Sequence, residues 1–514
     1  MKNYKPTYTP KKIVKYALIV ITLILISSYL VAGTGRIGFF SGVTFFANVA
    51  YLTLSALLFI HLKRAFWIFF IFFLFLAIYA PVGLLYGEIN NAFMLTLWGT
   101  YSNEAKEFLE SFPLKYIIFS ILSIILIIFF YFITNKKMLS KRQIITFLAI
   151  FIIATVTGKI WQSATTSSFA KAIRYFSESL EYLQHYKSVQ ITPKWEISNI
   201  KSKYKNFVVI IGESARRDYF EIYNYAIKNT PFLRQINGTF VDGFTAVGLN
   251  TLPALKFVLN ENGDINLNIV DLANLANFDT FWFSNQGYID FADTPNTLVA
   301  KRAKFSYFLQ NDLNQNDKSD ENLIKQFAKK IKEKSENERV FFLHTIGSHP
   351  ITCKKLTSNE YKKYSDKNTF NINCYVESIA QTDDNLRLIY EILYQNQQKT
   401  GESFSMIYFS DHGLSTNHNI NPIELIVLEN ASKEHFAIPL IKISSDDTER
   451  KFIKNESYAN YFPQNFAKWL GIEVANFSEF SDIFSEVKQK DTLGAKNLVK
   501  NPKADPAIDI SKFR

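Results

Sequence analysis

Two apolar stretches, FVVIIGES at 207–214 and SMIYFSDHG at 405–413, decide the fold of the larger part of this chain. Each is a run of β-branched and aromatic residues that stops at a polar cluster, which is typical of a buried parallel strand. Polar side chains at the carboxyl ends of such strands gather at one edge of the sheet. We therefore expect Glu213 to lie beside Asp411 and His412, although almost two hundred residues separate them in the chain.

Strands and helices alternate between and around these two stretches. Further strands are expected at 279–285 and 340–348, and helices at 321–334 and 379–395. This alternation predicts an open, mostly parallel α/β sheet with helices on both faces. Active sites on such sheets form where the strands end.

Most of the long apolar runs lie before about residue 160, in a chain of 514 residues that is 48% hydrophobic. A helix needs about 20 apolar residues to cross a bilayer. Five runs approach this length and are predicted to be membrane helices: 13–32, 40–62, 65–86, 115–134 and 143–160. The first is not a cleaved signal, because its apolar run exceeds the usual ~7–15 residues.

The predicted organisation has four parts. A membrane domain spans 1–160, a bridging helix and linker span 161–200, and an α/β domain spans 201–487. The tail, 488–514, is charged and weakly apolar, so we expect it to be extended or disordered.

Basic residues set the expected orientation in the membrane. They gather before the first span, at 63–64 between the second and third spans, and at 136–142 between the fourth and fifth. Because lysine and arginine favour the cytoplasmic side, the N-terminus is expected in the cytoplasm and the α/β domain outside. The net charge of +11 does not indicate nucleic-acid binding, because no nucleic-acid-binding motif accompanies it. A basic outer face that lies against anionic lipid head groups is the simpler explanation of this charge.

The two cysteines, Cys353 and Cys374, both fall in the outer domain. Because the compartment inferred for this domain is oxidising, a disulfide between them is expected. Closing this loop would stabilise the fold by about 3 kcal/mol in the chain-entropy model. The alternative is a pair of unpaired buried thiols.

Glu213, Asp411 and His412 form a set of oxygen and nitrogen ligands that suits zinc, and manganese or magnesium less well. An open coordination position on such a metal would polarise a hydroxyl or a phosphoryl oxygen. The alternative is that Asp-His after a strand is a polar turn that caps a helix.

A nucleophile is expected near the start of a helix, where free backbone N–H groups favour an anion. Thr251 in NTLPALK meets this requirement, because Pro253 stands in what would be the first helical turn. A metal would activate its hydroxyl, which is otherwise a weak nucleophile. The alternative is that Thr251 or Asn250 is a plain N-cap. The rival hydroxyls of Ser214 and Ser410 adjoin presumed ligands and are expected to support them.

Seven motifs follow the predicted spans in a fixed order: IGESARRDYFEIYNY at 211–225, TPFL at 230–233, NTLPAL at 250–255, FWFSNQG at 281–287, HTIGSHP at 344–350, CYVESIAQTD at 374–383 and YFSDHG at 408–413. Together with the five spans, this ordered set resembles the phosphoethanolamine transferases of bacterial inner membranes, a branch of the alkaline phosphatase and sulfatase superfamily. The resemblance covers nearly the whole chain.

The resemblance implies one or two zinc ions held by Glu213, Thr251, Asp411 and His412. Thr251 would take phosphoethanolamine covalently from phosphatidylethanolamine and pass it to a surface glycolipid, such as lipopolysaccharide or lipooligosaccharide, or to another periplasmic acceptor. The α/β domain would then be periplasmic, on a multi-pass protein of the inner membrane.

The resemblance also implies substrate contacts. His349 would contact the phosphate or move protons, whereas His344 is expected to be structural. Asn285 and Gln286 stand near a position where some members of the family have a lysine, and Asn285 is expected to bind substrate.

Thr96, Thr100 and Glu104 recur every four residues and so share one face of a helix. Members of the family bind the donor head group with a similar set, although Asn is usual where this chain has Thr96. The alternative is a solvated helix face.

The chain departs from the family after YFSDHG, where Leu414 stands in place of a common Glu. A later His of the family has two candidates here, His418 and His435, and we favour His418 as a substrate-binding residue.

Two other functions compete with transfer. One is a membrane-tethered phosphatase or another metal-dependent hydrolase; a sulfatase is disfavoured because no Cys/Ser-x-Pro-x-Arg site is present. The other is a non-catalytic membrane scaffold or transporter.

Overall fold

The computed structural model of the chain separates into two compact units. The helical unit comprises Met1–Met94 and Lys106–Leu180, and the sheet unit comprises Leu95–Ala105 and Glu181–Arg514. The structure describes residues 10–513 except positions 40, 100, 101, 111, 135–141, 143, 144, 147, 150–152, 154–162, 288–293, 313–318, 358–365, 419, 429, 476 and 478–480.

Within the described residues, four helices are long and apolar enough to cross a membrane. They are α1 (Pro10–Ala32), α2 (Gly42–His61), α3 (Lys63–Tyr86) and α6 (Leu114–Ile133). These correspond to the first four predicted spans. The fifth, 143–160, falls mainly on positions outside the described residues, so five spans are not confirmed.

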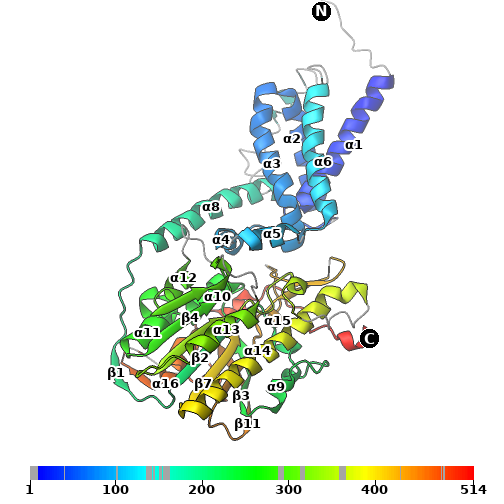
Figure 1. Ribbon diagram of the computed structural model, residues 1–514. Coiled ribbons are helices and arrows are strands. Elements are labelled where there is room, and N and C mark those ends of the chain that lie inside the picture. The colour runs from blue at the N-terminus through cyan, green and yellow to red at the C-terminus, as the bar shows by residue number, and fades with distance from the viewer. Residues whose placement is uncertain are drawn as a thin grey trace, which may run out of the picture. The chain divides into compact units, whose positions relative to one another are not determined.

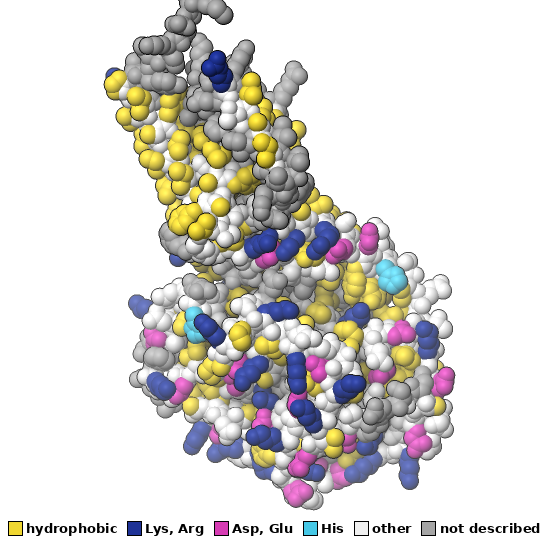
Figure 2. Space-filling model, turned by 180° about the vertical axis from the view of Figure 1, so that it is seen from behind, with side chains coloured by type: hydrophobic (Ala, Val, Ile, Leu, Met, Phe, Trp, Pro, Cys, Tyr) yellow, Lys and Arg dark blue, Asp and Glu magenta, His cyan; other side chains and the backbone are white. Residues whose placement is uncertain are grey.

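The bundle in the helical unit depends on close helix contact and an apolar surface. A Cβ atom on Gly33 would lie 2.4 Å from the Cβ of Ala80, so glycine lets α1 and α3 approach closely. Large apolar side chains such as Leu25, Ile68 and Phe132 are exposed, and Figure 2 shows hydrophobic side chains over much of the described bundle surface. Such a surface is suited to lipid.

Three more helices lie between or after these spans in the sequence: α4 (Asn91–Gly99), α5 (Ser102–Glu110) and α8 (Ala164–Ser188). The last lies within the stretch expected to hold a bridging helix and linker.

The sheet unit is built around one sheet of eight strands. Their spatial order is β11 (Arg450–Tyr458), β3 (Gly238–Thr245), β10 (Leu440–Ser444), β7 (Phe404–Ser410), β2 (Asn206–Gly212), β6 (Arg339–His344), β4 (Asp279–Ser284) and β5 (Phe305–Phe308).

The expectation of a mostly parallel sheet is not confirmed, because the sheet is mixed. Strand β10 runs antiparallel to both of its neighbours, β3 and β7, whereas β2 runs parallel to β6 and β7. For β10 to run parallel to β7, the chain would need a crossover that carries it back to the edge of the sheet where β7 begins. Between β7 and β10 the chain forms only the hairpin of β8 (Ser415–Asn417) with β9 (Glu424–Ile426) and the short α15 (Lys433–Phe436), and it re-enters from the same edge.

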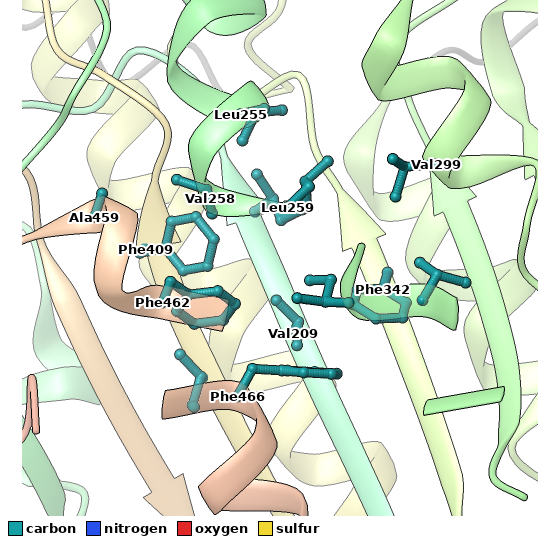
Figure 3. Close-up of a cluster of buried hydrophobic side chains, with 14 of the residues drawn as sticks. Val209, Leu255, Val258, Leu259, Val299, Phe342, Phe409, Ala459, Phe462 and Phe466 are labelled. Atoms are coloured by element: carbon teal, nitrogen blue, oxygen red, sulfur yellow. The ribbon is translucent and has the colours of Figure 1, made fainter. Parts of the chain in front are cut away.

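Helices cover both faces of the sheet, as expected (Figure 1). Apolar residues of α10 (Thr251–Val258), α11 (Ile269–Leu275), α12 (Pro295–Ala300) and α16 (Phe462–Leu470) pack on one face, and those of α13 (Asp320–Lys330) and α14 (Phe370–Thr400) on the other. Figure 3 shows the first core, in which Val209 of β2 and Phe342 of β6 lie below Leu255 and Val258 of α10.

Strand β2 is buried along its whole length, which explains its unbroken apolar sequence. Val209 and Ile211 face one core while Val208 and Ile210 face the other. Two short strands, β1 (Ile197–Ile200) and β12 (Ile472–Val474), form a separate antiparallel pair.

The predicted disulfide is confirmed: Cys353 and Cys374 are bonded. It ties the segment after β6 to the first turns of α14. Most of the tail has no helix or strand, as expected for an extended segment, but the tail is ordered. Its last part packs on the sheet unit, where the side chain of Ile510 is fully buried.

Candidate active site and metal centre

The site forms where β2 and β7 end side by side. Gly212 pairs with Ser410, so the next residue of each strand, Glu213 and Asp411, emerges at the same edge. The backbone N–H of Asp411 donates to the carbonyl of Gly212 over 3.0 Å. Ligand atoms of Glu213, Asp411 and His412 all lie within 4.8 Å of one another, and all three side chains are buried. The structure thus brings together the three residues predicted at this edge.

Sharp backbone turns hold Glu213 in place. Ser214 has a φ of 59°, a left-handed conformation that non-glycine residues rarely adopt. Gly347, at φ 45°, approaches so closely that a Cβ atom there would lie 3.0 Å from the backbone N and O of Glu213. Strained backbone of this kind gathers at functional sites.

Thr251 completes the cluster from helix α10. Its Oγ1 donates to Oε2 of Glu213 over 2.9 Å and lies 3.5 Å from Nε2 of His412. Nε2 of His412 in turn lies 3.3 Å from Oε1 of Glu213 and 3.5 Å from Oδ2 of Asp411. Thr251 is the first residue of α10, so the helix dipole favours negative charge on its oxygen.

These four groups fit a metal ion. Nδ1 of His412 lies 2.6 Å from the carbonyl oxygen of Gly413, a contact that it makes as the donor, which leaves Nε2 free to bind a metal. Oδ2 of Asp411 is buried without a hydrogen-bond partner in the described part of the chain. Ligand atoms around a tetrahedral zinc with bonds of ~2 Å lie about 3.3 Å apart, close to the spacings found here.

The electrostatics of the cluster also favour a cation. Burial and the charge of Glu213 raise the pKa of Asp411 to about 7. Burial opposes the protonated form of His412, but the charge of Asp411 and the hydrogen bond to Glu213 raise its pKa to about 9. Burial would raise the pKa of Glu213, yet the hydrogen bond and charge of His412 lower it. The site concentrates negative charge, which a bound dication would neutralise.

Neighbouring side chains support the ligands. Oγ of Ser214 donates to Oε1 of Glu213 over 2.7 Å. Oγ of Ser410 accepts from the N–H of Ala215 over 2.8 Å and donates to the carbonyl of His412 over 2.9 Å. The two serines therefore have the supporting role predicted for them.

Gln286 was not singled out as a site residue by its sequence context. Its Nε2 donates to Oε2 of Glu213 over 2.6 Å. The available signal was its place in SNQG, directly after strand β4, beside the other strand ends.

The two histidines after β6 differ in their surroundings. His349 lies close to Glu213. Burial raises the pKa of the Glu213 carboxyl, His412 lowers it, and the charge of His349 lowers it further by a smaller amount. His344 is buried at the end of β6, and burial lowers its pKa to about 4. Its Nδ1 lies 3.2 Å from Oγ of Ser284, as expected for a structural group that packs against the sheet.

Asn285 is fully buried and holds neighbouring groups. Its Nδ2 donates to Oδ1 of Asp320 over 2.7 Å, and its Oδ1 accepts from Gln310 over 3.0 Å. Asp320 also accepts from the backbone N–H groups of Ile346 and Gly347, at 2.8 and 3.0 Å. Substrate binding by Asn285 stays a prediction. Asp320 lies in none of the sequence motifs, and its hydrogen bonds order the segment that leads to His349.

The candidate histidines beyond Gly413 occupy different environments. His418 is exposed at the turn between β8 and β9. His435 is buried, and its ring stacks on His412 with centroids 5.9 Å apart. Its Nε2 donates to the carbonyl of Leu249 over 2.9 Å, two residues before Thr251. The structure thus places His435 beside His412 in the group of candidate metal ligands and leaves the substrate role of His418 as a prediction.

Two of the three predicted head-group residues lie on described helices. Thr96 lies on α4 and Glu104 on α5, and Thr100 lies outside the described residues. The side chains of Thr96 and Glu104 are also outside the described part, so their shared face stays a prediction.

The chain is similar to known proteins over most of its length. A family model described as Sulfatase matches residues 205–472. Phosphoethanolamine transferase OpgE of Escherichia coli (strain K12) is 32% identical over 438 residues, which cover 80% of this chain and 81% of OpgE. A putative phosphoethanolamine transferase of Haemophilus influenzae is 32% identical over 372 residues, or 70% of this chain and 76% of that protein.

Solved structures share the fold. Lipooligosaccharide phosphoethanolamine transferase A (EptA), an integral membrane protein from Neisseria meningitidis, matches 92% of this chain and 98% of its own, with a TM-score of 0.65 and 15% identity. The periplasmic domain of EptC from Escherichia coli in complex with Zn matches 63% of this chain and 98% of its own, with a TM-score of 0.50 and 17% identity. The chain is a membrane protein that belongs to the phosphoethanolamine transferases, enzymes of the sulfatase branch of the alkaline phosphatase superfamily.

Proposed function

We propose that this enzyme moves phosphoethanolamine from phosphatidylethanolamine to a surface glycolipid or another periplasmic acceptor, through a covalent intermediate on Thr251. The observation that carries the proposal is the 2.9 Å hydrogen bond from Thr251 to Glu213, inside a buried cluster with Asp411 and His412. A hydroxyl at a helix N-terminus within a set of metal ligands is suited to nucleophilic attack on phosphorus.

The reaction has two displacement steps. In the first, Oγ1 of Thr251 attacks the phosphorus of the donor, the P–O bond to diacylglycerol breaks, and the diacylglycerol oxygen takes up a proton. In the second, an acceptor hydroxyl or phosphate oxygen attacks the same phosphorus and the bond to Thr251 breaks. In balance, the proton that leaves Thr251 in the first step ends on the diacylglycerol oxygen. In the second step Thr251 takes up the proton of the acceptor hydroxyl, or a proton from water when the acceptor is a phosphate oxygen, so the enzyme is regenerated.

Zinc is the proposed cofactor, as one or two ions, with Glu213, Thr251, Asp411 and His412 as ligands. Bound zinc would lower the pKa of the threonine hydroxyl and offset the charge on the transferring group. Glu213 then orients Oγ1 of Thr251, and Gly413 fixes the ring of His412. The zinc complex of the EptC domain, which shares the fold, agrees with this choice of metal.

We propose that His349 acts on the phosphate or moves protons. Its position supports this, because a charge on His349 lowers the pKa of the Glu213 carboxyl. Thr96, Thr100 and Glu104 are proposed to bind the ethanolamine head group. His418 and Asn285 are proposed substrate contacts.

The sheet unit is proposed to be periplasmic, on an inner-membrane protein with a cytoplasmic N-terminus. The disulfide between Cys353 and Cys374 supports an oxidising compartment for this unit. The basic segments between the spans support the same orientation.

The test is a peptide map of the purified full chain after incubation with phosphatidylethanolamine and no acceptor. Mass spectrometry should find phosphoethanolamine on Thr251, and the Thr251→Ala variant should carry none. An adduct on another residue would overturn the assignment.

A second measurement separates transfer from hydrolysis. Diacylglycerol release is followed with and without lipooligosaccharide as acceptor. A transferase should release about one equivalent of diacylglycerol per enzyme without acceptor and continue only when acceptor is present. Steady release in its absence would identify a phosphatase.

A further inference from the structure

We propose that the end of the chain is part of the active-site framework, and that Asp505 is a positioning residue for the metal ligands. We call residues 505–510 the C-terminal strap. Acting through Arg216, the strap would hold together the two segments that follow β2 and β7. The proposal rests on the proposed metal site but assigns a role to the strap, which none of the seven motifs contains.

Arg216 stands between these two segments. It comes three residues after Glu213, and its side chain is fully buried. Its Nη1 donates to the carbonyl of Leu414 over 3.3 Å, two residues beyond His412. A Cβ atom on Gly413 would lie 2.7 Å from Cγ of Arg216, so the arginine stem packs against the glycine whose carbonyl orients His412.

Asp505 closes this arrangement from the strap. Its Oδ2 accepts from Nη1 of Arg216 over 3.1 Å and from the backbone N–H of Thr416 over 2.9 Å, and its carbonyl accepts from Nη2 of Arg216. One strap residue therefore binds the segment after β2 and the segment after β7 at once.

A second chain of contacts runs from Asp505 to the nucleophile. The backbone N–H of Asp505 donates to Oε2 of Glu434 over 3.1 Å. The next residue, His435, donates from Nε2 to the carbonyl of Leu249, two residues before Thr251.

The charges make Asp505 necessary to this arrangement. The guanidinium of Arg216 is buried, and two carboxylates face it: Asp218, at 3.0 Å from Nε and 2.7 Å from Nη2, and Asp505. Burial disfavours the charged form of Arg216, but these carboxylates outweigh burial and raise its pKa. Loss of Asp505 would leave a buried cation with one carboxylate fewer and release the N–H of Thr416.

The strap has other anchors that do not involve Asp505. The N–H of Ala507 donates to Oδ2 of Asp218 over 2.9 Å, and Tyr225 donates to the carbonyl of Ile508 over 2.8 Å. Ile510 is fully buried. Replacement of Asp505 by asparagine should leave the strap and its backbone contacts in place and remove the side-chain charge that pairs with Arg216.

The test compares Asp505→Asn with the matched control Asp509→Asn in purified full chain, using zinc alone in competition with a chromophoric chelator. Asp509 lies in the same strap, and among the described residues its side chain forms hydrogen bonds and an ion pair only with Ser511 and Lys512. Removal of a group that orients metal ligands typically lowers metal affinity by about 10–100-fold. D505N should therefore bind zinc at least about 10-fold more weakly than the parent protein, and D509N should bind zinc as tightly as the parent protein.

Two readouts separate positioning from general stability. Cobalt in place of zinc should give a visible spectrum that D505N shifts and D509N does not, because the spectrum reports ligand geometry. In the transfer assay D505N should lower kcat while KM for the donor stays within about twofold. Parent-like zinc affinity and cobalt spectrum in D505N would overturn the inference.

Failure of the inference differs from failure of the proposed function. If the parent binds zinc and D505N matches it, the strap has no positioning role and the metal site stands. If the parent binds no zinc and transfers nothing, the proposed function fails. If D505N does not fold, Asp505→Glu takes its place: weaker zinc binding at an unchanged unfolding midpoint supports the role, and unchanged binding rejects it.

Discussion

Oγ1 of Thr251 lies 2.9 Å from Oε2 of Glu213, although one residue opens helix α10 and the other follows strand β2. The contact joins the proposed nucleophile to a proposed metal ligand. Removal of the glutamate charge should therefore affect metal binding and the nucleophile together.

The variant Glu213→Gln keeps the size of the side chain and loses its charge. We expect zinc affinity to fall by roughly 100-fold or more, because even groups that only orient ligands cost about 10–100-fold. Zinc content after dialysis and the yield of the Thr251 adduct measure the two effects. Glu261→Gln, at a buried glutamate that accepts from Gln464, is the control and should retain zinc. Retention of zinc by E213Q would remove Glu213 from the ligand set.

The two histidines beyond Gly413 should separate in a kinetic comparison. His435→Gln should lower kcat by about 10-fold or more, because its ring holds the carbonyl of Leu249 and stacks on His412. His418→Gln should raise KM and leave zinc binding unchanged, because His418 is exposed on a hairpin turn. The opposite assignment of the two effects would place His418 in the catalytic framework.

Local chemistry made part of this site predictable. Two buried strands that end in acids must leave the sheet at the same edge when they run parallel, which brought Glu213 to Asp411. A proline two residues after Thr251 marked the start of a helix. These relationships depend on short stretches of chain, so the sequence carries them.

Long-range packing could not be predicted in the same way. The antiparallel direction of β10 depends on the route of the chain after β7, which no local motif encodes. The tail has a composition typical of disorder, yet Asp505 pairs with Arg216 from 289 residues away. A buried ion pair of this kind is visible only when both segments are folded.

The disulfide offers a test of how firmly the segment after β6 is held. Replacement of both Cys353 and Cys374 by serine should destabilise the sheet unit by about 3 kcal/mol in the chain-entropy model. The thermal unfolding midpoint in detergent should fall, and the parent protein treated with dithiothreitol should fall to the same value. An unchanged midpoint in the double variant would show that the disulfide does not contribute to stability.

Stability should also depend on pH through His344. Burial lowers its pKa from 6.5 to about 4 in the folded protein. Above pH 6.5 the ring is neutral in both folded and unfolded chains, so it has no effect. As the pH falls from 6.5 to about 4, the unfolded chain binds a proton that the folded chain does not, and stability is lost. Below about pH 4 both states carry the proton and the loss ends.

The size of this effect can be measured with a variant that does not titrate. Between pH 7 and pH 5 the linkage amounts to about 2 kcal/mol, because each pKa unit corresponds to about 1.4 kcal/mol. His344→Asn should therefore show a smaller fall of the unfolding midpoint over this range than the parent, by a few degrees. His418→Asn, at an exposed site, should fall as the parent does. Equal pH dependence in H344N and the parent would mean that the buried ring takes up its proton without cost to the fold.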